Sequence, residues 1–129
     1  MIGILLITHG SLGKSLLESA GHVLGGPLDN VAEIGVNACT SIEKLQTKAL
    51  QAITHIDRGK GVLVLTDMYG GSPSNITKNL INKSKVRGVS GVNLPMLIRA
   101  LTYRNKSLDV VAEKAVSGGN EGVLKIPVE

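Results

Sequence analysis

The sequence predicts an α/β fold with a doubly wound, mostly parallel sheet and helices on both faces. Apolar runs of strand length alternate along the chain with stretches that have the spacing of amphipathic helices. Glycine or proline lies at several of the junctions, where it separates one element from the next. Such an alternation favours parallel strands joined by right-handed helical crossovers. A length of 129 residues suits a single domain, residues 1–129.

The first half of the chain predicts two strand–helix pairs. Ile2–Thr8 is a continuous apolar run, which is typical of a strand covered on both faces. Ser11–Leu24 has helical spacing and is followed by a glycine–proline cluster that ends the helix. A second short strand is predicted over Val31–Val36. Ser41 has the character of an N-cap, and the helix behind it is predicted to run to about Asp57.

The second half predicts the remaining strands and helices. Gly61–Thr66 is a third apolar strand, and Ser72 and Pro73 indicate the N-cap and first residue of a helix that runs to about Ser84. The other predicted elements are a strand over Val86–Asn93, a helix that starts at Pro95, a helix over about Ser107–Ser117 and a short C-terminal strand over Val123–Val128.

Polar residues follow the first and third predicted strands. In doubly wound sheets, sites lie beyond the carboxyl ends of the strands, at the point where the strand order reverses. With a flavodoxin-like order of 2-1-3-4, that point falls between the first and third strands. The first strand ends in Thr8-His9-Gly10, and Asp67 follows the third. We therefore expect His9 and Asp67 to face each other, although they are far apart in the sequence.

An imidazole beside a carboxylate has a defined chemistry. The carboxylate accepts the proton of one ring nitrogen, which leaves the other nitrogen free as a nucleophile or base. Gly70 and Gly71 allow backbone amides to approach an anion closely, and Ser72 opens a helix whose N-terminus favours anions. These features predict a phosphohistidine site. His9 and Asp67 would carry out catalysis, while Gly71 and Ser72 would bind the phosphoryl group.

Three segments of the chain carry a family resemblance: Gly3–Gly10 (GILLITHG), Val62–Asn75 (VLVLTDMYGGSPSN) and Gly91–Leu97 (GVNLPML). They resemble the mannose-family IIA component of the bacterial phosphoenolpyruvate-dependent phosphotransferase system. The resemblance spans the whole chain and implies that His9 is the phosphorylated histidine and Asp67 the carboxylate that orients it. It also implies that Ser72, with the amides around Gly71, binds the phosphoryl group. Tyr69 stands where phenylalanine is common in the family and keeps an aromatic ring beside the loop.

The resemblance further implies a role as a phosphocarrier. HPr, or an analogous phosphocarrier, would donate the phosphoryl group to His9, and a IIB component on a separate chain would accept it for sugar uptake. Family members are typically homodimers, some with an exchanged C-terminal strand, a part that Val123–Val128 would play. Peripheral association with a membrane permease, which usually selects the sugar, is also implied. The alternative is a stand-alone regulatory IIA protein whose phosphorylation state controls partner proteins without sugar transport.

Composition argues against several other classes of protein. The net charge of +4 is modest, and the two aromatic residues, Tyr69 and Tyr103, offer no stacking platform, so nucleic-acid binding is not expected. The three histidines have no metal-ligand spacing, and neither a metal nor another cofactor is expected. A start without a basic segment and the single Cys39 predict a cytoplasmic protein.

A phosphate-loop nucleotide-binding protein is a remote alternative. Gly13-Lys14-Ser15 follows the first strand at the start of a helix, as in that motif. The first glycine of the motif would be Thr8, however, and a β-branched residue resists the tight turn. A receiver domain phosphorylated on Asp67 is disfavoured because Thr8-His9-Gly10 supplies no acidic residue to hold a divalent cation.

Overall fold

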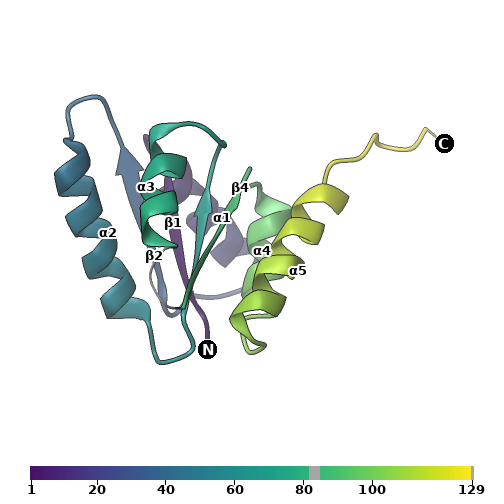
Figure 1. The fold of residues 1–129 in the computed structure, drawn as a ribbon. Helices are drawn as coiled ribbons and strands as arrows, with labels where there is room; N and C mark the ends of the chain where they lie inside the picture. The colour runs from purple at the N-terminus through teal and green to yellow at the C-terminus, as the bar shows by residue number, and fades with distance from the viewer. Residues whose placement is uncertain (82–84, 129) are drawn as a thin grey trace.

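The computed structural model describes residues 1–81 and 85–128, and this part of the chain forms four strands and five helices (Figure 1). The strands are β1 (Gly3–His9), β2 (Val31–Val36), β3 (Val62–Thr66) and β4 (Val86–Ser90). The helices are α1 (Leu12–Leu24), α2 (Ile42–Ile56), α3 (Ser72–Leu80), α4 (Leu94–Thr102) and α5 (Leu108–Glu121). All strand pairs are parallel and the order is β2-β1-β3-β4, which confirms the predicted fold class and strand order.

Different helices cover the two faces of the sheet. Ile4 and Leu6 of β1 pack into one core with side chains of α1, α4 and α5. Leu5 and Ile7 point to the opposite face and pack with α2 and α3. All four side chains are almost completely buried because successive side chains of a strand alternate between faces and both faces are covered. This double burial explains why the central strands are continuous apolar runs.

The ends of α3 and β4 differ from the sequence prediction. Gly71 is the N-cap of α3 and Ser72 is already helical, so the predicted cap is wrong by one residue; the Ser72 hydroxyl makes no capping hydrogen bond. The predicted end of this helix near Ser84 lies outside the described residues. β4 ends at Ser90 rather than Asn93 because Gly91, with φ of 84°, turns the chain away from the strand direction.

Helix α5 continues past its predicted end. It passes through Gly118 and Gly119 and ends at Glu121. The glycines stay helical because α4 packs directly against them. A Cβ at Gly118 would lie 2.7 Å from Cβ of Arg99, and one at Gly119 would lie 2.8 Å from Cε of Met96.

Within residues 1–81 and 85–128, no helix combines the length and the apolar character needed to cross a membrane.

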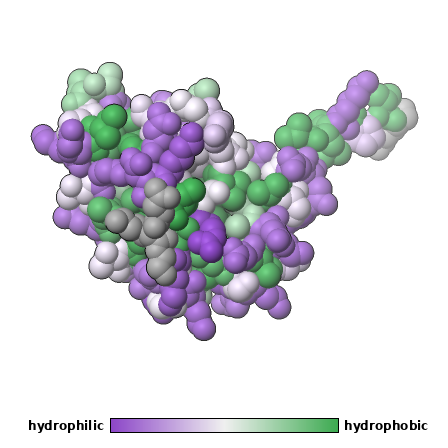
Figure 2. Space-filling view, in the orientation of Figure 1, coloured by the Kyte–Doolittle hydropathy of each residue, from purple (hydrophilic) through white to green (hydrophobic). Residues whose placement is uncertain are grey.

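The predicted C-terminal strand over Val123–Val128 is wrong for a single copy of the chain. This segment has no regular secondary structure and projects from the end of α5 away from the sheet (Figure 1). A strand requires a neighbour to satisfy its backbone hydrogen bonds, and the sheet in the described residues has four strands that do not include this segment. Apolar surface is visible along the projecting segment in Figure 2.

We predict that Gly35→Ala destabilises the fold next to His9. Gly35 of β2 lies against the turn that follows β1, and a Cβ there would lie 2.2 Å from the carbonyl oxygen of Gly10. Because the backbone at Gly10 would have to move, we expect the free energy of unfolding, measured in urea, to fall by about 1–3 kcal/mol. Gly26→Ala is the matched control, since its Cβ would meet no atom within 4 Å. Equal unfolding free energies for the two variants would contradict this account.

Candidate functional site

His9 and Asp67 lie side by side at the carboxyl end of the sheet. His9 is the last residue of β1 and Asp67 directly follows β3; the register of the two strands sets Ile7 opposite Thr66. Nδ1 of His9 lies 2.9 Å from Oδ2 of Asp67. The backbone N–H of His9 donates to the same oxygen, also at 2.9 Å. One carboxylate oxygen therefore holds both the backbone and the ring of His9.

The environment of Asp67 favours its ionised form. Its side chain is 12% exposed, and its Oδ1 accepts a hydrogen bond from the backbone N–H of Met68 at 3.0 Å. Burial alone would raise the pKa of Asp67, but the hydrogen bonds from the backbone and ring of His9 outweigh it and lower the pKa below its ordinary value. An ionised carboxylate can only accept, so Nδ1 of His9 carries the proton. In the neutral ring, the lone pair is then on Nε2.

The free edge of the His9 ring faces the loop before α3. The His9 side chain is 49% exposed, and within the described part of the chain its Nε2 has no hydrogen-bond partner. A Cβ built on Gly71 would lie 3.0 Å from Cε1 and 3.4 Å from Nε2 of His9. A side chain at this position would therefore crowd the nitrogen that is free to react. Glycine leaves that space open to a ligand.

The start of α3 supplies hydrogen-bond donors beside this space. Gly70 has φ of 90°, a conformation that suits glycine, and Gly71 then caps the helix. The N–H of Asn75 is the first to make an intrahelical bond, to the carbonyl of Gly71 at 3.0 Å. The N–H groups of Ser72 and Ser74 precede it and have no partner within the helix. Together with the positive end of the helix dipole, they form a suitable receptor for an anion.

Thr8 is a site residue that the sequence reasoning missed. Its side chain is fully buried, and its hydroxyl accepts a hydrogen bond from the N–H of Gly13 at 2.8 Å. This bond fixes the short turn between His9 and α1. A hydroxyl-bearing residue at the end of an apolar strand was the available signal, since a buried hydroxyl requires a hydrogen-bond partner.

The same geometry shows that the phosphate-loop alternative is wrong. That motif requires a glycine-rich loop that connects a strand to a helix and wraps a phosphate. In this structure Thr8 and His9 belong to β1, and Gly13-Lys14-Ser15 belongs to α1. Only Gly10 and Ser11 remain between the two elements, and no such loop exists.

The other residues considered in the sequence lie elsewhere. Asn93 caps α4 by accepting from the N–H of Met96 at 2.9 Å, and its amide donates to the carbonyl of Gly119 at 3.2 Å, so it joins α4 to α5. Cys39 is an exposed free thiol. In residues 1–81 and 85–128, no three histidine, cysteine or acidic side chains gather in a way that could hold a metal ion.

Comparisons of sequence identify the family of proteins that the chain resembles. The model of the family described as "PTS system fructose IIA component" matches residues 3–116. The chain is 38% identical, over 99% of its length, to the "PTS system mannose-specific EIIAB component" of Escherichia coli (strain K12), and it spans 41% of that relative. It is 32% identical, over 81% of its length, to the "PTS system fructose-specific EIIA component" of Bacillus subtilis (strain 168), of which it covers 71%.

Solved structures show the same fold. The mannose/sorbose specific IIA subunit of the phosphotransferase system from Enterococcus faecalis superposes with a TM-score of 0.88 and 25% identity, over 99% of this chain and 96% of that one. Phosphotransferase system component EIIA from Streptococcus agalactiae gives a TM-score of 0.86 and 27% identity, over 97% of each chain. The chain therefore belongs to the mannose family of IIA components of the phosphoenolpyruvate-dependent phosphotransferase system.

Proposed function

We propose that this protein is a cytoplasmic phosphocarrier that accepts a phosphoryl group on His9 from HPr, or an analogous phosphocarrier, and passes it to a IIB component for sugar uptake. The observation that carries the proposal is the 2.9 Å hydrogen bond between Nδ1 of His9 and Asp67, which leaves Nε2 facing the glycine loop. Membership of the family supports the general role. The exposed free thiol of Cys39 is consistent with a reducing compartment.

In the proposed transfer, the lone pair of Nε2 of His9 forms a bond to phosphorus while the bond from phosphorus to the donor's leaving atom breaks. Nδ1 keeps its proton, so the ring becomes positively charged, and the carboxylate of Asp67 stabilises that charge. The oxygens of the bound phosphoryl group meet the N–H groups at the start of α3 and the hydroxyl of Ser72. Attack by a nucleophile of the IIB component reverses these changes and restores the neutral ring.

The surroundings of His9 suit docking by another protein. Three large apolar or aromatic side chains near it are exposed: Leu12 at the start of α1, and Met68 and Tyr69 in the loop after Asp67, with exposed fractions of 42%, 57% and 72%. Such side chains are enriched at protein interfaces. The ammonium group of Lys78 lies 4.6 Å from the centre of the Tyr69 ring, which favours a fixed ring position.

We also propose that two copies of the chain form a homodimer through their C-terminal segments. Val123, Leu124, Ile126 and Val128 are 67–92% exposed, although all are strongly apolar. Among the described residues, strand β4 has only β3 as a neighbour in the sheet, so its other edge is open there. A groove of about 450 Å³ lies beside that edge, between Gly88-Val89 and α5. The segment of a second copy could both pair with the edge of β4 and bury its side chains in this groove.

We predict that His9 is the phosphorylated residue. Incubation with phosphoenolpyruvate, enzyme I and HPr should add the mass of one phosphoryl group, in an acid-labile and base-stable linkage. His9→Ala should remove this label, and His55→Ala, which changes an exposed histidine on α2, should retain it. Addition of a IIB component should discharge the labelled protein. Retention of the label in His9→Ala would exclude His9 as the acceptor.

We predict that the carboxyl group of Asp67 titrates below its ordinary pKa. Because its pKa is lowered on folding, its contribution to stability is present at neutral pH and is lost as the pH falls through the folded-state pKa, below about pH 4. The difference in unfolding free energy between wild type and Asp67→Asn should therefore shrink as the pH falls in that range. NMR titration of the Asp67 side-chain carbonyl measures the pKa directly; a midpoint at or above the ordinary value contradicts the stabilisation of the carboxylate by the hydrogen bonds from His9.

We predict that removal of residues 123–129 weakens the homodimer. Light scattering coupled to gel filtration should give a dimer for the full chain and a lower mass, or a strongly concentration-dependent one, for the truncated chain. The control is Lys125→Gln, which leaves the apolar side chains in place. A full chain that is monomeric, or a truncated chain that dimerises equally well, would rule out this mode of assembly.

A further inference from the structure

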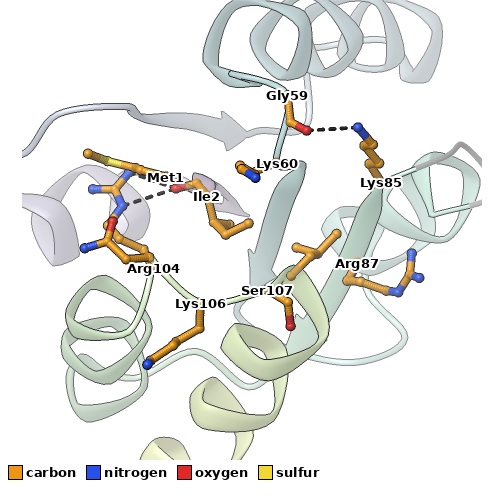
Figure 3. Close-up of a pocket in the computed structure, with 11 residues that line it drawn as sticks. Met1, Ile2, Gly59, Lys60, Lys85, Arg87, Arg104, Lys106 and Ser107 are labelled. Atoms are coloured by element: carbon orange, nitrogen blue, oxygen red, sulfur yellow. Dashed lines mark hydrogen bonds between the residues drawn. The ribbon is translucent and has the colours of Figure 1, made fainter.

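A concave site lies at the end of the sheet opposite to His9, and Figure 3 shows the residues that line it. It is an open pocket of about 600 Å³ formed by residues that precede β1 and β3, by Lys85 and Arg87 at the start of β4, and by the turn between α4 and α5 with the first residue of α5. The seven residues of β1 run from this end of the sheet to His9, a distance of about 20 Å. The volume lies within the range of small-molecule binding sites. The pocket is thus separate from the phosphohistidine site and large enough for a metabolite.

The wall of this pocket is strongly basic. Five of its lining residues carry a positive charge and none is acidic: Lys60, Lys85, Arg87, Arg104 and Lys106. They come from segments that are distant in the sequence and that only the fold brings together. A concave wall lined by charges of one sign concentrates the potential and attracts ions of the opposite sign.

Two of these cations are fixed by neutral acceptors. Nζ of Lys85 donates to the carbonyl of Gly59 at 2.9 Å (Figure 3). Arg104 is only 8% exposed; its Nε and Nη2 donate to the carbonyl of Ile2 at 3.1 Å, and Nη2 also donates to the carbonyl of Asn30 at 2.8 Å. These bonds orient the side chains without neutralising them. A buried guanidinium without an anionic partner is unfavourable, and a bound anion would relieve that cost.

Compensating carboxylates near the pocket are few. Arg87 pairs with Asp109 at 3.0 Å, but both side chains are well exposed, so water screens the pair. Asp29 acts electrostatically on Arg104 but forms no ion pair with it among the described residues. The positive charge of the pocket therefore remains largely available to a ligand.

The pocket is built from tightly packed backbone. Lys85 has φ of 63°, in the left-handed region that residues other than glycine seldom adopt. Gly61, with φ of 97°, approaches so closely that a Cβ there would lie 2.7 Å from the carbonyl oxygen of Lys85 and 2.9 Å from Cδ2 of Leu108. These contacts indicate that the pocket is formed before any ligand arrives, which reduces the entropy lost on binding.

The positive end of a long helix also lies at this pocket. The other four helices of the described chain follow strands and begin at the His9 end of the sheet, whereas α5 follows α4 and begins at the opposite end. Ser107, its N-cap, and Leu108 line the pocket. The N–H groups of Leu108 and Asp109 precede the first hydrogen bonds of this 14-residue helix and favour negative charge nearby, some of which the carboxylate of Asp109 in the first turn already supplies.

We propose that this pocket is a binding site for a small phosphorylated molecule with two or more negative charges. The basic wall and the start of α5 favour an anion, and the concave shape selects a small molecule over a flat macromolecular surface. This inference goes beyond the proposed function and does not depend on phosphorylation of His9.

NMR titration of the ¹⁵N-labelled chain with inorganic pyrophosphate, at constant ionic strength, tests the proposal. We expect saturable shifts at the amides of Gly59, Gly61, Ser107 and Leu108. The His9→Ala variant should bind with the same affinity, so a failure of the proposed function would leave this result unchanged. Shifts that do not saturate, or that are confined to Gly71 and Ser72 at the other end of the sheet, would overturn the proposal.

Charge-matched variants separate a specific site from the general attraction of a basic protein. Lys60→Gln with Lys106→Gln removes two exposed charges of the pocket and should weaken pyrophosphate binding by about tenfold or more. Lys44→Gln with Lys48→Gln removes two exposed charges from α2, outside the pocket, and should change the affinity by no more than about twofold. Equal weakening by the two pairs would overturn the proposal, as would tighter binding of a polyglutamate peptide than of pyrophosphate at the same amides.

Discussion

The parallel pairing of β1 with β3 is the constraint on which the His9 site depends. Its register places the ends of the two strands at the same level, so the residues that follow them share one edge of the sheet. His9 can then donate from both its backbone and its ring to one oxygen of Asp67. The ring is thereby tied to the end of the strand. A shift of one residue in the register would turn every side chain of β1 to the opposite face and separate the pair.

Elements whose signals are local could be predicted from the sequence. The buried strands are continuous apolar runs, and Ser41 caps α2 as predicted, accepting from the N–H of Lys44 at 3.2 Å. Errors arose where an element depends on distant partners. The predicted end for α5 was near Ser117, but the helix continues through two glycines, because close packing against α4 requires glycine there and outweighs its low helix propensity. The apolar character of residues 123–128 predicted a strand, yet a strand also requires an unpaired edge within reach.

The sites at the two ends of the sheet show the same limit on what the sequence can predict. His9 and Asp67 could be paired in advance because parallel topology fixes where strand ends meet. The hydroxyl of Thr8 at the end of an apolar strand indicated that a partner was needed, but the sequence does not show that this partner is the N–H of Gly13. The basic pocket was hidden for a different reason: Lys60, Lys85 and Lys106 are widely spaced in the sequence. Their positive charges are dispersed along the chain, and only the fold gathers them around one cavity.

A helix N-terminus that favours an anion lies at each end of the sheet, but the side chains next to the two N-termini differ. At the start of α3 the partner is the free Nε2 of His9, a nucleophile that a carboxylate orients, so a phosphoryl group could be held there covalently and released. At the start of α5 the partners are fixed cations, and the hydroxyl of Ser107 is occupied as the helix cap, accepting from the N–H of Val110 at 3.4 Å. That arrangement attracts a phosphate without attacking it. The chemistry of the neighbouring side chain, rather than the helix end, therefore separates the proposed transfer site from the proposed binding site.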